Sequence, residues 1–111
     1  MKKFIVLFLL TTPLLLQFCS TSKNAAKSKI TYAAHVQPLM EANCTPCHFP
    51  PKGNKKPLDT YVAVKDEIAD ILTSIQKNPG EKGFMPSRHP KLSDSTINVF
   101  VQWQKDGLLE K

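Results

Sequence analysis

Cysteine is scarce in this sequence. The 111 residues contain three, Cys19, Cys44 and Cys47, and this odd number excludes a disulfide framework as the main source of stability. Histidine also occurs three times. His35 and His89 stand alone, so the second ligand pair of a structural zinc site is missing. No alternating pattern of strands and helices surrounds the cysteines, which disfavours a thioredoxin-like redox pair. Zinc binding and thiol exchange are therefore the weaker alternatives.

The sequence also lacks a long uninterrupted apolar run. A stable transmembrane helix needs about 20 consecutive apolar residues, whereas the N-terminal apolar segment, residues 4–16, is shorter and contains two threonines and Pro13. A short basic start with two lysines precedes it, which is the order of a secretory signal. We expect residues 1–19 to be a signal peptide that is removed. A permanent membrane span is the less favoured alternative.

The end of this signal carries a second feature. Leu16-Gln17-Phe18-Cys19 resembles a bacterial lipobox, in which the cysteine becomes the lipidated N-terminus. Phe18 departs from the small residue of that pattern, so the alternative is an unmodified hydrophobic cysteine. Residues 20–29 are polar, as expected of a flexible tether. These features predict an exported protein that is periplasmic, or anchored by lipid at Cys19 to the inner or outer membrane and facing the periplasm.

The segment with most chemical content is Cys44-Thr45-Pro46-Cys47-His48, a C-x-x-C-H motif that occurs once. This motif is the attachment signature of c-type haem. Two thiols three positions apart can add to the two vinyl groups of one porphyrin, and the next residue then lies beneath the iron. The motif predicts a single covalent haem c, held by Cys44 and Cys47, with His48 as an axial ligand of its iron.

The second axial ligand decides between electron transfer and small-molecule chemistry. Met85 stands in Gly83-Phe84-Met85-Pro86, on a loop from which a thioether can reach across a haem face, and we expect it to be this ligand. His89, four residues later, could ligate instead and give a bis-histidine haem. His35 is better suited to the surface or to a helix cap, and Met40 to the core.

At this point the chain resembles the class I cytochrome c family, over about residues 30 to 109. The shared features are a helix leading into C-x-x-C-H, a Met-Pro pair on a later loop and a C-terminal amphipathic helix. The resemblance implies an all-α fold, a small bundle of three to five helices wrapped around one covalently bound haem, for the domain 30–111. It also implies one-electron transfer without substrate chemistry, and therefore no enzymatic activity.

Capping residues and apolar spacing predict the helices of this bundle. The first should begin after Thr31 and run toward Asn43, with Pro38 at its first turn or at a kink. The second should follow Asp59 or Thr60 and continue as one helix to about residue 77. The third should begin at Ser93. Residues expected to pack between the first and last helices are Val36, Leu39, Met40, Phe100 and Trp103.

The formal charge of +6 falls to +4 when two lysines leave with the signal. Two basic groups should flank the haem edge: Lys52, Lys55 and Lys56, and Lys82, Arg88 and Lys91. They suit redox donors and acceptors with acidic docking surfaces. Nucleic-acid binding is not expected, because no recognition pattern accompanies the charge. The leading hypothesis is an electron carrier. Alternatives are a haem enzyme or gas sensor with an open or displaceable distal site, and a module of a larger complex.

Overall fold

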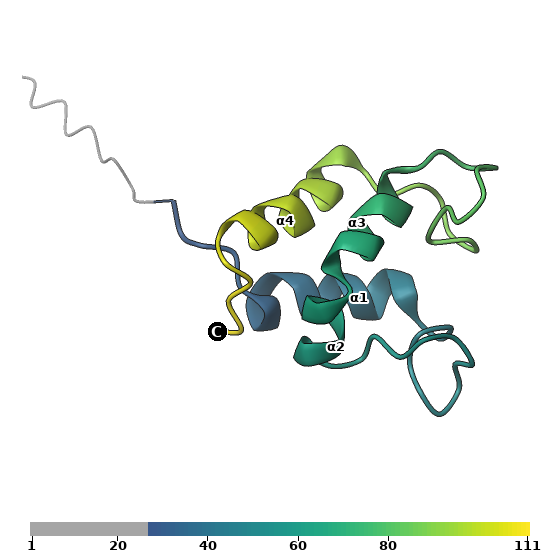
Figure 1. The fold of residues 1–111 in the computed structure, drawn as a ribbon, viewed down its shortest axis with the longest axis horizontal. Helices are drawn as coiled ribbons and strands as arrows, with labels where there is room; N and C mark the ends of the chain where they lie inside the picture. The colour runs from purple at the N-terminus through teal and green to yellow at the C-terminus, as the bar shows by residue number, and fades with distance from the viewer. Residues whose placement is uncertain (1–26) are drawn as a thin grey trace, which may run out of the picture.

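The structure is a computed structural model that describes residues 27–111. The predicted signal (1–19), Cys19 and residues 20–26 of the predicted tether lie outside the described residues. Within them the chain forms a π-helical turn and four α-helices: η1 (Tyr32–Val36), α1 (Gln37–Cys44), α2 (Tyr61–Asp66), α3 (Ile68–Gln76) and α4 (Asp94–Lys105) (Figure 1). No strand occurs in residues 27–111, where the only pairing of extended backbone is an isolated bridge between Thr31 and Leu109. The predicted all-α class is confirmed for this part of the chain.

The first helix combines η1 and α1. Thr31 is its N-cap by position, with extended backbone, but its side chain makes no capping hydrogen bond. Thr31 therefore stands at the predicted N-cap position, but the capping hydrogen bond expected of its side chain is not formed. Pro38 lies in the first turn of α1, as expected. Because proline has no N–H to donate to the preceding turn, the helix upstream of it is free to widen, and η1 has the π-helical pattern that such an interruption permits.

The second predicted helix is interrupted. Thr60 caps α2, and its hydroxyl accepts the Ala63 N–H at 3.2 Å, as expected. Glu67 then leaves the helical conformation, with φ −102° and ψ 8°, so α2 and α3 are two helices and the expectation of one was wrong. The apolar spacing runs through both, which is why the pattern alone did not reveal the break. The Glu67 carboxylate forms an ion pair with Lys56.

The last helix follows its signals closely. The Ser93 hydroxyl accepts the Thr96 N–H at 3.2 Å and caps α4. Gly107 follows the helix with φ 95°, a conformation that favours glycine and ends helices. Helix α4 packs against η1 and α3. Its buried residues Phe100 and Trp103 share one core with Val36 and Met40, so the predicted packing of the first and last helices is confirmed, with Leu39 only partly buried.

An aromatic cluster closes one end of this core. The rings of Tyr32, Tyr61 and Trp103 have centroid separations of 5.5 to 6.3 Å in edge-on or tilted arrangements, which are favourable aromatic geometries. The C-terminal segment covers the cluster. Leu109 O accepts the Trp103 indole N–H at 2.8 Å and the Tyr32 N–H at 2.8 Å, and Leu108 O accepts the Tyr61 hydroxyl at 2.8 Å.

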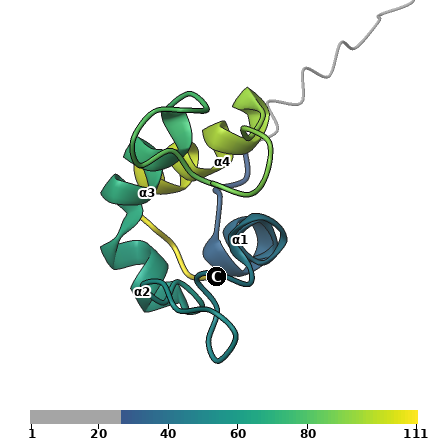
Figure 2. The same cartoon turned by 90° about the vertical axis from the view of Figure 1, so that its right-hand side faces the viewer.

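The two long loops lie at the opposite end. Figure 1 shows residues 27–31 and the C-terminus at one end of the molecule, and loops 49–58 and 78–92 at the other. Seen from the loop end, loop 78–92 runs over α3 and α4, and loop 49–58 lies below, between α1 and α2 (Figure 2). In residues 27–111 no helix combines the length and apolar character needed to cross a bilayer.

Candidate functional site

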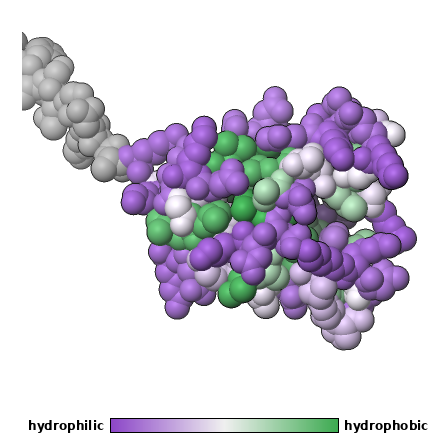
Figure 3. Space-filling view, viewed as in Figure 1, coloured by the Kyte–Doolittle hydropathy of each residue, from purple (hydrophilic) through white to green (hydrophobic). Residues whose placement is uncertain are grey.

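A cavity of about 530 Å³ lies between the two loops. Its volume is within the range of small-molecule and cofactor sites, roughly 300–1,000 Å³. The C-terminal end of α1, both loops, α3 and Phe100 of α4 line it. In Figure 3 the hollow opens on the right-hand side, where the surrounding surface is largely hydrophilic. Its apolar walls are formed by Leu58, Ile71, Ile75, Leu92 and Phe100.

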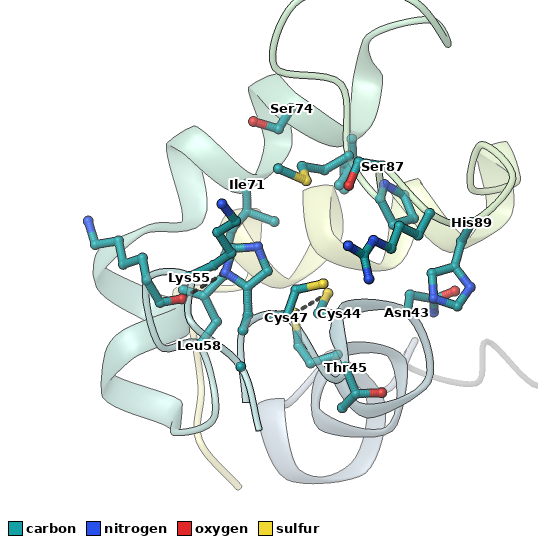
Figure 4. A pocket seen from close by; sticks show the side chains of 18 of the residues that line it. Asn43, Cys44, Thr45, Cys47, Lys55, Leu58, Ile71, Ser74, Ser87 and His89 are labelled. Atoms are coloured by element: carbon teal, nitrogen blue, oxygen red, sulfur yellow. Dashed lines mark hydrogen bonds between the residues drawn. The ribbon is translucent and has the colours of Figure 1, made fainter. Parts of the chain in front are cut away.

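The C-x-x-C-H motif forms a turn at the end of α1. Cys44 is the last residue of the helix, and Thr45 adopts extended backbone with φ −81° and ψ 154°. The Thr45 hydroxyl donates to Glu41 O at 2.7 Å, and the His48 N–H donates to Cys44 O at 3.0 Å. These bonds satisfy carbonyls that a helix end leaves without partners. The turn brings Cys44, Cys47 and His48 to the cavity wall, and Figure 4 shows both cysteines facing it.

The two thiols are half-buried and free. Cys44 Sγ donates to Met40 Sδ across 3.8 Å. Burial raises the pKa of the Cys44 thiol to about 11. Reactive C-x-x-C thiols instead have lowered pKa values, often at helix N-termini, whereas Cys44 ends its helix, where the dipole disfavours a negative charge. The geometry therefore argues against the thiol-exchange alternative.

The His48 ring is oriented by the loop that follows it. Its Nδ1 lies 2.7 Å from the carbonyl oxygen of Lys56, so Nδ1 carries the proton and donates it. The other ring nitrogen, Nε2, then has its lone pair available for a metal. The Leu58 N–H donates to His48 O at 2.9 Å and ties the same loop to the motif. His48 thus has the tautomer and support of a metal ligand.

Met85 lines the same cavity from loop 78–92. Its N–H donates to Ser74 O at 3.2 Å, which fixes the backbone of the loop to α3. The neighbouring Pro86 is buried, and the Met85 side chain packs at the edge of the core. Lys91 Nζ donates to Asn78 Oδ1 at 2.8 Å and joins the two ends of the loop. The structure therefore brings Met85 and the C-x-x-C-H turn to one cavity, although 37 residues separate Met85 from His48.

The other candidate ligands have different surroundings. His89 is exposed but also lines the cavity, on a turn closed by its N–H to Pro86 O at 3.3 Å. His35 lies outside the cavity lining, and its Nδ1 accepts the Thr31 N–H at 3.1 Å, so the predicted capping or surface role agrees with its position. Met40 is fully buried and lines the wall near Cys44, in agreement with its predicted core role.

Basic side chains surround the mouth of the cavity. Lys52, Lys55, Lys56 and Arg88 all line it, whereas Lys82 and Lys91 of the predicted second group do not. Of these cations, Lys56 is paired with Glu67. The carboxylates in the lining are those of Glu67 and Asp70, so the rim has an excess of positive charge.

A zinc site has no ligand set in the described part of the chain. Nowhere in residues 27–111 do three or more His, Cys, Asp or Glu side chains come close enough to hold a metal ion. Structural zinc takes four such ligands. The cavity instead offers the imidazoles of His48 and His89 and thioether or thiol sulfurs, dispersed around apolar walls.

Sequence reasoning missed the residues that support the candidate ligands His48 and Met85. The carbonyl of Lys56 holds His48, and the carbonyl of Ser74 holds the Met85 backbone. Backbone carbonyls carry no signal in a sequence. Gly53 also lines the cavity, and its place in a loop rich in proline and lysine indicated only a turn.

The chain was also compared with known proteins. Searches against protein-family models, curated proteins and solved structures found no match.

Proposed function

We propose that this protein is an exported mono-haem c-type cytochrome that carries single electrons. One observation carries the proposal. The C-x-x-C-H turn and the Met85 loop, which are distant in sequence, line one cavity of about 530 Å³ with apolar walls. The resemblance to class I cytochromes c predicts that these two elements lie at one site, and we propose that a single haem c binds between them.

The residues present fit this group. Haem iron held in the cavity would supply the chemistry, accepting and releasing one electron. His48 offers Nε2 because Nδ1 is committed to Lys56 O at 2.7 Å. Met85 offers a thioether from a loop that is attached to α3. A nitrogen and a thioether sulfur are axial donors of electron-carrying cytochromes, in which the thioether raises the potential.

The remaining parts of the lining suit the porphyrin and its carboxylates. Leu58, Ile71 and Phe100 supply an apolar surface. Cys44 and Cys47 lie on one turn and supply two thiols for thioether bonds. Lys52, Lys55 and Arg88 stand at the polar mouth, where cations stabilise carboxylates. Covalent attachment also suits a protein with an export signal, because a cofactor held only by coordination can be lost to the surroundings.

The basic side chains at the cavity also suggest which redox partners the protein binds. An excess of cations around the cavity mouth attracts acidic surfaces and raises the rate of encounter with them. This attraction weakens as the salt concentration rises. We propose that electron donors and acceptors dock here through acidic groups. Anchoring of the domain through Cys19 stays a prediction of the sequence.

The decisive experiment tests Met85. The chain is produced in a host that matures c-type haem, and oxidised and reduced absorption spectra are recorded for the native protein and for Met85→Ala. We expect the weak red-edge band of methionine-to-iron coordination in the native protein and its loss in the variant. Met40→Leu is the matched control, because it removes the other methionine sulfur in the cavity lining and should keep the band.

A second function is favoured by a specific observation. Arg88 and His89 line the cavity on the Met85 loop, and polar side chains near an open iron site are typical of haem enzymes and sensors. In that case the native protein would show a high-spin spectrum that binds carbon monoxide or cyanide readily. A native low-spin spectrum with the methionine band supports the electron carrier and contradicts the enzyme or sensor.

A further inference from the structure

Gly53 makes an unusually close approach to the motif. A Cβ atom placed on Gly53 would lie 2.2 Å from Pro46 O, 2.3 Å from Cys47 O and 2.6 Å from Cys47 C. All three are backbone atoms, which cannot move unless the C-x-x-C-H turn moves with them. Loop 49–58 can therefore fold back over the turn only if residue 53 has no side chain.

The reason for glycine here differs from that at other positions. Gly80 and Gly107 have positive φ angles of 93° and 95°, and a Cβ on either would meet nothing within 4 Å. Gly53 is absent from the positive-φ glycines. Positions 80 and 107 favour glycine because of their positive φ angles, whereas position 53 requires glycine because there is no room for a side chain.

The close approach belongs to a chain of contacts that ends on His48. The Gly53 N–H donates to Phe49 O at 2.9 Å, and the Lys55 N–H donates to Cys47 O at 3.1 Å. Cys47 O is also one of the atoms that a Cβ at 53 would meet. Lys56, the next residue, presents its carbonyl to His48 Nδ1 at 2.7 Å.

We infer that Gly53 is a positioning residue for His48. It lets loop 49–58 lie against Cys47 O, and this contact places the Lys56 carbonyl on the imidazole. A carbonyl partner fixes the orientation of a ligating histidine and raises its basicity. The inference rests on the proposed function, since it concerns His48 as the axial ligand.

Gly53→Ala in the haem-loaded protein tests this. We expect the reduction potential to rise by about 59 mV, a tenfold shift of a one-electron equilibrium, because a less basic histidine stabilises the oxidised iron less. By proton NMR, the His48 Nδ1–H should exchange with solvent at least tenfold faster. Gly107→Ala is the matched control: it lowers stability through its positive φ and should leave both readouts unchanged.

A second pair of variants decides the question if Gly53→Ala yields no mature protein. Lys55→Pro removes the N–H that donates to Cys47 O without adding an atom at 53, and Lys55→Gln removes the same charge but keeps the N–H. A rise in potential in the proline variant over the glutamine variant supports the inference. Equal potentials overturn it, as does Gly53→Ala with native potential and protection. If the native protein carries no covalent haem, the proposed function itself fails.

Discussion

The two ends of the core are completed in different ways. At the aromatic end, Tyr32, Tyr61 and Trp103 pack together, and carbonyls of the C-terminal segment accept the Tyr61 hydroxyl and the Trp103 indole N–H. At the loop end, the same core opens into a cavity of about 530 Å³ lined by the C-x-x-C-H motif and Met85. Protein atoms complete the first end. The second has apolar walls and candidate ligand side chains around the cavity, and under the proposed function the haem completes it.

The largest effect is expected from removing the two thiols of the loop end that would attach the haem. Cys44→Ala with Cys47→Ala should abolish covalent haem attachment and remove most of the cooperative thermal unfolding of the helices, because a small domain has little other apolar surface to bury there. Circular dichroism at increasing temperature, together with a haem stain of the denatured protein, measures both. A double variant that melts as sharply as the native protein would contradict this, because it would show that packing at the aromatic end is enough for cooperative folding without covalent haem.

The next largest effect should come from the aromatic end. Trp103 is fully buried, and Trp103→Ala should lower the free energy of unfolding by about 3–5 kcal/mol, as expected for a large core side chain, while covalent haem remains. Val62→Ala is the control, because Val62 is 60% exposed and its loss should cost less than about 0.5 kcal/mol. Urea unfolding of both variants gives the comparison. A cost below about 1 kcal/mol for Trp103→Ala would contradict a closed aromatic end.

A smaller change tests whether the two ends are independent. Tyr61→Phe removes only the hydroxyl that donates to Leu108 O at 2.8 Å, and should cost about 1 kcal/mol. Its reduction potential should equal that of the native protein, because the change lies in the aromatic cluster. Tyr32→Phe is the matched control, since it removes a hydroxyl from the same cluster without breaking this bond. A shifted potential in Tyr61→Phe would show that the ends are coupled.

The smallest expected effect depends on pH. The Ile30 N–H, which donates to Asp106 Oδ2 at 2.7 Å, and the Gln102 side chain lower the pKa of Asp106 below its ordinary value of 3.8. Folding therefore favours the charged carboxylate, so this stabilisation is present above pH 3.8 and is lost as the pH falls through the folded-state pKa. In Asp106→Asn the melting temperature should fall less steeply on acidification. Parallel curves for variant and native protein would contradict this.

Much of the local structure was predictable because its causes are local. Thr60 and Ser93 accept backbone N–H groups three residues ahead, and both helices begin where these caps stand. Gly107 ends the last helix through its positive φ. The break at Glu67 was not predictable, because the apolar spacing continues across it.

The candidate ligands His48 and Met85 were predicted from the sequence, but the groups that support them were not. The C-x-x-C-H spacing and the Met-Pro pair are patterns of side chains, which a sequence displays directly. The partners of His48 and Met85 are the carbonyls of Lys56 and Ser74. Every residue has a carbonyl, so only the folded backbone selects these two.

By itself, the sequence determined the helical class of residues 27–111 and the helix starts at Thr60 and Ser93, and it supplied the C-x-x-C-H and Met-Pro patterns on which the proposed haem site rests. Only the tertiary structure decided that Met85 and the C-x-x-C-H turn line one cavity, and that loop 49–58 returns to orient His48 through a contact open to glycine alone. The physical reason is range: caps and spacing act within a few residues, whereas a cavity and a close backbone approach depend on segments that only the folded chain brings together.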